Sequence, residues 1–201
     1  AKEIIKIAAE SWANAVKLQT YTADTMTIDC DLPDFQINSG TAWDGKNLYQ
    51  LYGEAYTPWE WHKELKNYAN SLWLELFSTP FDETAVDFLE SIDVPCHKIA
   101  SFENNDIPLI KKVARTGKPI IISTGMATYE DIQLALDTIR WEWNNQIILL
   151  KCTSSYPAPY EEINLKTIES FRDDFGVIPG LSDHTLGIEI PIASVVMWAK
   201  V

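Results

Sequence analysis

The sequence predicts an α/β fold of the (β/α)8 TIM-barrel class, and three observations support this prediction. Short runs of β-branched and aliphatic residues alternate with helical periodicity along all 201 residues, which indicates parallel strands joined by crossover helices. Every candidate strand ends in polar side chains, as expected of a barrel whose strand ends meet on one face. Neither GxGxxG nor GxxxxGKS/T occurs, so a doubly wound nucleotide-binding sheet is the weaker alternative.

Six strand–helix units can be traced, followed by a further helix. One missing strand at each end would complete a barrel of eight. We therefore interpret residues 1–201 as a single partial catalytic barrel domain, incomplete at both ends. The candidate strands, in chain order, are 15–19, 74–78, 97–101, 119–123, 147–152 and 178–182.

Two helices carry clear start signals. Thr57 is followed by Pro58 at the first helical position and by Glu60 at the third, and Thr128 is followed three residues later by Asp131. Both patterns predict a capped helix N-terminus. The helix after Thr128 also has an apolar stripe at helical spacing, which predicts one face packed on the sheet and consists of Ile132, Ala135, Leu136 and Ile139.

The residues at the helix-to-strand joints form an unusual series. At two joints the residue after the helix is Gly117 or Gly176, as expected where the backbone turns left-handed. At four comparable joints a tryptophan stands in this place, although a bulky residue there is strained by roughly 1–2 kcal/mol. These residues are Trp12, Trp73, Trp143 and Trp198.

We interpret these tryptophans as positions where the natural residue is glycine. The chain has eight Trp and eight Gly, whereas glycine alone usually accounts for about 7% of a protein. A bacterial gene that uses UGA for glycine would give this sequence when UGA is translated as tryptophan, and Trp141 is a fifth candidate. The alternative is that they are true tryptophans packed at the base of the barrel.

Composition excludes several classes of function. Sixteen basic and twenty-nine acidic residues give a formal net charge of −13, which argues against nucleic acid or an anionic membrane as a partner. No apolar run approaches the roughly 18–20 residues that a membrane span needs. Three widely spaced cysteines without a CxxC pattern argue against a disulfide framework or a zinc site, and they favour a reducing cytoplasm.

The polar residues at the strand ends indicate a small, highly charged anion as ligand. Two ammonium groups and a ring of hydroxyls suit a phosphate ester, which is bound by charge-assisted hydrogen bonds. Alternatively, such hydroxyls cap the next helix and each lysine is simply solvated. The set consists of Lys17, Lys98, Thr79, Ser101, Ser123, Ser154 and Ser182.

His184 is the candidate metal ligand, because imidazole binds divalent transition metals and this residue follows a strand end. The alternative is a hydrogen-bonded structural histidine. Glu103 follows the third candidate strand and is a candidate acid or base, with an exposed capping carboxylate as the alternative. We assign no functional role to His62 or His97 from the sequence.

The segment 21–56 has no clear periodicity and several aromatic residues. A connection this long on the functional face of a barrel is typical of a lid or a substrate-specificity loop. A contact between two subunits is the other interpretation.

The motifs of the chain resemble the sialic acid synthase family over essentially its whole length. Within the family, TYTADTMT (20–27) and YTPWEWH (56–62) are most similar to the pseudaminic acid branch. N-acetylneuraminate and legionaminate synthases share the remaining motifs, which are VKLQT (16–20), FSTPFD (77–82), KIASFE (98–103), STGMA (123–127), KCTSSYPAP (151–159) and GLSDHTLG (180–187).

The resemblance implies condensation of phosphoenolpyruvate with an open-chain acetamido sugar, 2,4-diacetamido-2,4,6-trideoxy-altrose in the pseudaminic branch, to give a nine-carbon 2-keto acid and phosphate. A divalent metal, Mn²⁺ or Mg²⁺, would be held by His184 and polarise the aldehyde. Gln19, Glu103 and Tyr156 would face the sugar, with Glu103 managing protons. The residues that would hold phosphoenolpyruvate are Lys17, Thr79, Lys98, Ser101, Ser123, Ser154 and Ser182. Some family members have Asn at the position of Ser154.

The chain also departs from the family pattern. The first barrel strand, a segment with a second metal-binding histidine and the C-terminal antifreeze-like domain are absent from these residues, so we expect the piece alone to be inactive. Through that domain, the resemblance implies a homodimer at full length. Other hypotheses are a Schiff-base barrel aldolase acting through Lys98 or Lys151, which would trap with borohydride, and a non-catalytic sugar-binding relic.

Overall fold

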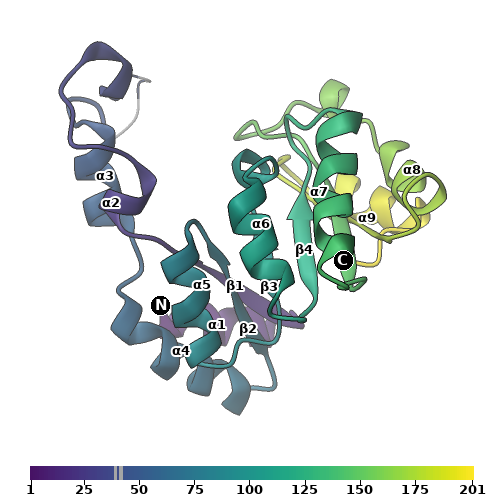
Figure 1. Ribbon diagram of the computed structural model, residues 1–201, viewed down its shortest axis with the longest axis horizontal. Coiled ribbons are helices and arrows are strands. Elements are labelled where there is room, and N and C mark those ends of the chain that lie inside the picture. The colour runs from purple at the N-terminus through teal and green to yellow at the C-terminus, as the bar shows by residue number, and fades with distance from the viewer. Residues whose placement is uncertain (39, 41–42) are drawn as a thin grey trace. The chain divides into compact units, whose positions relative to one another are not determined.

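The computed structural model describes residues 1–38, 40 and 43–201. The chain divides into two compact units, Ala1–Val94 and Pro95–Val201, and each is described by itself. Every paired strand within the units is parallel, and helices separate consecutive strands, as Figure 1 shows. This is the fold class of a (β/α)8 barrel, incomplete in this chain, as the sequence predicts. That residues 1–201 form one domain stays a prediction.

The first unit packs helices against a pair of parallel strands, β1 and β2. Its core consists of Ile5, Leu65, Ala69, Leu74 and Leu76, with Val16 and Leu18 against it. The apolar side chains come mainly from α1, α4 and the strands. Their burial packs the strand pair against the helices. The elements are α1 Lys2–Glu10, β1 Ala15–Thr20, α2 Ala23–Met26, η1 Pro33–Phe35, α3 Leu48–Ala55, α4 Trp59–Ser71, β2 Glu75–Pro80 and α5 Glu83–Ser91.

The second unit has four parallel strands that pair in chain order, β3 with β4, β4 with β5 and β5 with β6. In Figure 1 α6 and α7 flank β4, and these two helices pack against each other. β4 is entirely buried, as expected of a strand covered on both faces. The elements are β3 His97–Ile99, η2 Ser101–Glu103, α6 Ile107–Ala114, β4 Ile120–Ser123, α7 Tyr129–Trp141, β5 Ile147–Cys152, η3 Tyr160–Glu162, α8 Thr167–Asp173, β6 Ile178–Ser182 and α9 Glu189–Val196.

All six predicted strands are present, with small shifts at their ends. β3 ends at Ile99 because Ser101 already begins a 3-10 turn. The capping box of Thr128 and Asp131 is confirmed, and Ala135, Leu136 and Ile139 of its apolar stripe are buried while Ile132 is half-buried. The prediction of a cap at Thr57 is wrong. α4 begins at Trp59, because Pro58 is the residue outside the helix whose carbonyl accepts the first turn's hydrogen bond.

The four tryptophans at the helix-to-strand joints do adopt left-handed backbone conformations. Their φ angles are +63° at Trp12, +64° at Trp73, +64° at Trp143 and +72° at Trp198, next to +71° and +65° at the two predicted glycines. The first three side chains are more than nine-tenths exposed, so they bury nothing that would offset the strain. Trp141 differs, because it is the last residue of α7 and does not have a positive φ.

The segment 21–56 contains more regular structure than its sequence indicates. Asn47 forms a capping box with Gln50 at the start of α3, and α2 and α3 pack side by side (Figure 1). Tyr21 contacts Tyr52 and Phe81 edge to face, which ties α3 to the residues that follow β1 and β2. Residues 39, 41 and 42 of the segment lie outside the described part of the chain, and the roles in specificity or dimer contact stay predictions.

None of the helices in the described ranges combines the length and the apolar character that crossing a membrane requires.

Candidate active site

The ammonium group of Lys98 is buried in the second unit, where Lys98 is only 6% exposed. Its Nζ donates to the Oγ of Ser123 at 2.5 Å and to the carbonyl oxygen of Ile99 at 2.9 Å. The two residues come from the paired strands β3 and β4, so the strand pairing brings them together as predicted. A buried cation costs free energy unless it is well hydrogen-bonded, and it provides a strong attachment point for an anion.

Two serine hydroxyls converge on Gly125, the second residue after β4. The Oγ of Ser101 accepts a hydrogen bond from the Gly125 amide at 3.2 Å. A Cβ atom at position 125 would lie 2.1 Å from the Oγ of Ser154 and 2.8 Å from the Oγ of Ser101. Only glycine permits this approach, so hydroxyls that follow β3 and β5 meet at the end of β4 because residue 125 has no side chain.

Glu103 closes the 3-10 turn after β3 and is half-buried. Desolvation raises the pKa of its carboxyl group, the charge of Asp106 raises it further, and Lys98 lowers it. Its Oε2 is buried without a hydrogen-bond partner. The alternative of an exposed capping carboxylate does not apply, because Asp106 caps α6 by accepting from the Leu109 amide. Glu103 therefore has an acceptor oxygen available for a ligand and a carboxyl group whose pKa is raised by burial.

His184 lies just after β6, next to Ser182 and Tyr156. Its Nε2 is 3.3 Å from the Oγ of Ser182, and the Tyr156 ring centroid is 4.4 Å from the imidazole centroid. Tyr156 is 71% exposed. Within the described ranges, no group of three or more His, Cys, Asp or Glu side chains is placed to hold a metal ion. The metal-binding role of His184 stays a prediction.

The first unit holds the three remaining predicted residues. Gln19 and Thr79 are direct partners in the parallel register of β1 and β2, and Lys17 pairs with Phe77 two positions earlier. Thr79 is buried, whereas Lys17 and Gln19 remain accessible to solvent. Desolvation by the surrounding protein lowers the pKa of Lys17. Because strand side chains alternate between faces, these residues share one side of the strand pair.

Gly125 was missed from the sequence, although a glycine at the end of a strand can indicate a close backbone approach. Lys151 was named only as an alternative lysine for an aldolase. Lys151 donates to the carbonyl of Cys152 at 2.9 Å and to Thr153 Oγ1 at 3.1 Å, and desolvation lowers its pKa. It lines a cavity of about 440 Å³ together with Ser154, Ser155 and Glu162.

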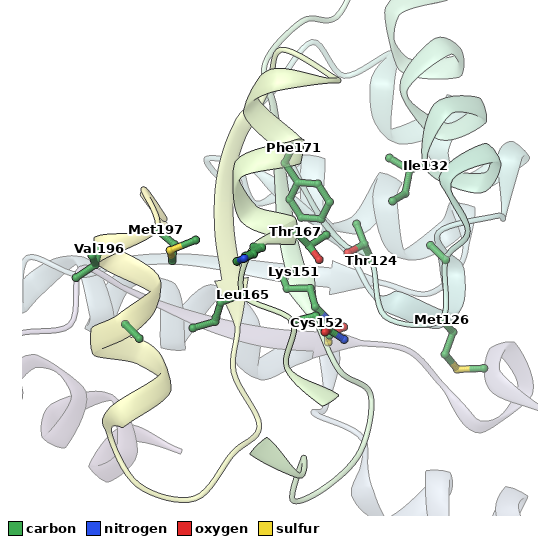
Figure 2. A pocket seen from close by; sticks show the side chains of 14 residues that line it. Thr124, Met126, Ile132, Lys151, Cys152, Leu165, Thr167, Phe171, Val196 and Met197 are labelled. Atoms are coloured by element: carbon green, nitrogen blue, oxygen red, sulfur yellow. Dashed lines mark hydrogen bonds between the residues drawn. The ribbon is translucent and has the colours of Figure 1, made fainter. Parts of the chain in front are cut away.

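A second cavity of about 820 Å³ shares Met126, Lys151, Cys152 and Asn164 with the first. Figure 2 shows Lys151, Cys152 and Thr124 gathered near Thr167 and Phe171 of α8. Most of its other lining side chains are apolar, including Val196, the last residue of α9, and Met197 directly after it.

The predicted residues thus form groups within each unit. The second unit joins Lys98 with Ser123, Ser101 with Ser154 around Gly125, and Ser182 with His184 and Tyr156. The first unit aligns Gln19 with Thr79 on neighbouring strands. That Lys17, Lys98, Ser123 and His184 all line one mouth stays a prediction.

Comparison with known proteins places these groups in context. The family model described as NeuB family matches residues 4–201. The chain is 48% identical over 200 residues to pseudaminic acid synthase from Helicobacter pylori, which covers all of this chain and 58% of that protein. It is 38% identical over 205 residues to N,N'-diacetyllegionaminic acid synthase from Legionella pneumophila, with 100% and 57% covered.

Solved structures of similar proteins also match this chain. An N-acetylneuraminic acid synthetase from Leptospira borgpetersenii in complex with citrate superposes with a TM-score of 0.87 at 29% identity, covering 99% of this chain and 64% of that chain. The spore coat polysaccharide biosynthesis protein SpsE from Bacillus subtilis gives 0.82 at 36% identity, with 99% and 52% covered. The chain therefore spans somewhat more than half the length of the curated relatives it matches.

Proposed function

The chain belongs to the NeuB family, and from this premise we propose that it acts in the condensation of phosphoenolpyruvate with an open-chain diacetamido-trideoxy hexose. The products are a nine-carbon 2-keto sugar acid, pseudaminic acid, and phosphate. The observation that carries the proposal is the cluster in the second unit, where the Lys98 ammonium, the Ser123 hydroxyl and the two serines around Gly125 offer donors for a small phosphorylated anion.

In the proposed reaction the methylene carbon of phosphoenolpyruvate attacks the sugar aldehyde carbon and forms the new C–C bond. Water adds at C2 of the former enol, and the tetrahedral intermediate collapses to the 2-keto acid as the C2–O bond to phosphate breaks. Lys98 and Ser123 hold the phosphorylated enol in place. Glu103, with its raised pKa, gives a proton to the aldehyde oxygen as negative charge develops there.

The proposal includes a divalent metal, Mn²⁺ or Mg²⁺, which acts as a Lewis acid on the aldehyde when it is bound. His184 is the one residue that we assign to it, because no cluster of three ligands occurs among the residues described. Its partners would be Asp183, water and substrate, or groups that these residues do not supply.

The identity of the sugar is the finer part of the proposal. The relatives described above favour the pseudaminic branch, at 48% identity against 38% for the legionaminic enzyme. A legionaminate or N-acetylneuraminate synthase is the alternative. We also propose a homodimer and a cytoplasmic location, the latter supported by three cysteines that form no disulfide bond.

A Schiff-base aldolase remains a second candidate function because of one observation. The pKa of Lys151 is lowered by desolvation and its side chain lines a cavity, as a carbonyl-trapping lysine requires. Borohydride in the presence of the open-chain sugar, whose aldehyde can form an imine, would then link the sugar to Lys151. The synthase route forms no imine and predicts no such adduct.

The direct test is an incubation of the full-length protein, with glycine restored at the four joint tryptophans, with phosphoenolpyruvate, Mn²⁺ and each candidate sugar in turn. The proposal expects phosphate release that depends on the sugar and is fastest with the diacetamido-trideoxy-altrose. Binding of sugar without phosphate release would instead support the relic. The matched control is the same protein with Lys98→Met, which should bind and release far less.

A further inference from the structure

A buried chain of hydrogen bonds links helix α4 to the ends of both strands in the first unit. The Oγ1 of Thr20 lies 2.8 Å from the Nε2 of His62 and 2.7 Å from the Oγ of Ser78. All three residues are completely buried. No functional role was assigned to His62 from the sequence, yet its ring bonds the last residue of β1, which in turn bonds Ser78 of β2.

The donor and acceptor of each hydrogen bond follow from the contact between His62 and Pro58. The Nδ1 of His62 lies 3.2 Å from the carbonyl oxygen of Pro58, which can only accept, so Nδ1 carries the hydrogen. Burial lowers the pKa of His62, which keeps the ring neutral near neutral pH. Nε2 is then an acceptor for the Thr20 hydroxyl, and Thr20 in turn accepts from Ser78. Each donor among these hydrogen bonds therefore has a single acceptor.

The hydrogen-bonded residues Thr20 and Ser78 are next in sequence to two predicted substrate-binding residues. Gln19 precedes Thr20 on β1, Thr79 follows Ser78 on β2, and Gln19 and Thr79 are register partners. Neighbouring side chains on a strand point to opposite faces. The hydroxyls of Thr20 and Ser78 therefore point toward α4, while Gln19 and Thr79 point to the other face.

The surroundings hold His62 firmly in this place. Its ring meets Phe88 of α5 edge to face at 5.3 Å, and Trp59 stacks on Phe88 at 4.7 Å. Trp59 also donates from Nε1 to the carbonyl of Tyr21 at 3.2 Å, one residue beyond Thr20. The end of β1 is thus fixed to α4 through both its side chain and its backbone.

We propose that His62 is a positioning residue that, through Thr20 and Ser78, holds the ends of β1 and β2 at the spacing that Gln19 and Thr79 need to contact the substrates. The inference rests on the proposed function for the identity of those substrates. The rest of the same helix face packs with apolar residues such as Leu65 and Ala69, so packing alone does not require polar groups here. A satisfied buried polar network specifies one arrangement of the groups it joins.

The test compares variants of the full-length protein. His62→Leu fills the space but leaves the Thr20 hydroxyl without its acceptor, and Thr20→Val removes that hydroxyl. His62→Gln restores an acceptor near the position of Nε2. Leu65→Ala is the matched control, because it weakens packing of the same helix without touching the hydrogen bonds.

The NMR signals of Gln19 and Thr79 and the KM for the sugar are expected to change in the same variants. Nitrogen NMR of the His62 ring should show hydrogen on Nδ1 and none on Nε2. In His62→Leu and Thr20→Val the signals of the Gln19 side-chain amide and the Thr79 methyl should shift, and the sugar KM should rise about tenfold, the effect of one lost buried hydrogen bond. His62→Gln should recover most of both effects, and Leu65→Ala should lower thermal stability alone.

The outcomes distinguish this inference from the proposed function. A wild type that releases no phosphate overturns the proposed function, while the NMR signals still decide whether His62 controls the positions of Gln19 and Thr79. Hydrogen on Nε2, unshifted signals in His62→Leu, or equal shifts in Leu65→Ala would each overturn the inference.

Discussion

The Nζ of Lys98 lies 2.5 Å from the Oγ of Ser123, across the β3–β4 pair. Both groups are almost fully buried, so the ammonium is kept in place by the protein before any ligand arrives. A site arranged in this way binds an anion without first having to order a long lysine side chain.

Replacing Lys98 by Met should therefore affect phosphoenolpyruvate more than the sugar. A hydrogen bond to a charged group contributes about 1.5–3 kcal/mol, so kcat/KM for phosphoenolpyruvate should fall at least tenfold. Ser123→Ala should cause a smaller loss, because the ammonium remains. Steady-state kinetics with each substrate varied in turn measures both effects. Equal losses for the two substrates would contradict the assignment of Lys98.

Gly125→Ala should damage the site and the fold together. The new Cβ would meet Ser154 Oγ at 2.1 Å and Ser101 Oγ at 2.8 Å, so both serines must move. Overpacking of this kind typically costs about 1–3 kcal/mol. Gly53→Ala in α3 is the control, because nothing lies within 4 Å of a Cβ there and alanine favours the helix by about 1 kcal/mol. Denaturant unfolding should show a lower free energy of unfolding for Gly125→Ala and a higher one for Gly53→Ala.

Glu103→Gln should abolish proton transfer and change the pH profile. Burial raises the pKa of Glu103 in the folded protein, so the protonated form persists above the usual carboxyl range. The wild-type rate should fall as pH rises through this raised pKa. The same sign applies to stability: the folded state is favoured while Glu103 is protonated, and that contribution is lost as pH rises. The variant should lose roughly 10²–10⁴ in kcat and this pH-dependent step. A pH–rate profile that is identical in the two proteins would rule out the role.

The joint tryptophans give a prediction that does not depend on the reaction. Trp73→Gly should stabilise the protein by about 1 kcal/mol, because it relieves a positive φ of +64° at a side chain that is 96% exposed. Trp141→Gly should destabilise it by a similar amount, because residue 141 is helical. Thermal unfolding of the two variants measures this contrast.

The gene decides the origin of these residues. Our interpretation predicts TGA codons at positions 12, 73, 143 and 198, but TGG at Trp43, Trp59 and Trp61. TGG at all of these positions would mean that the protein truly carries four strained tryptophans.

The fold was predictable because each strand carries its own signal. Runs such as 147–150 are continuously apolar, and the glycines and tryptophans at the helix ends mark the joints. The cluster of Lys98 and Ser123 was predictable for the same reason, since parallel strands place their ends side by side.

The parts that were missed depend on contacts between distant residues. His62 lies on a helix whose sequence shows only an amphipathic pattern, and its link to Thr20 spans 42 positions. The 3-10 turn that buries Glu103 and the role of Asp106 as the cap of α6 also depend on tertiary packing. The start of α4 shifted by one residue, because Pro58 supplies the first carbonyl of the helix from outside it.

The most direct measurement follows the bridging oxygen of phosphoenolpyruvate. With ¹⁸O at the C2–O–P position, the full-length protein should transfer the label to phosphate whenever the sugar is present, because the reaction breaks the C–O bond. Label kept at C2 of the nine-carbon product, or no phosphate release at all, would contradict the account.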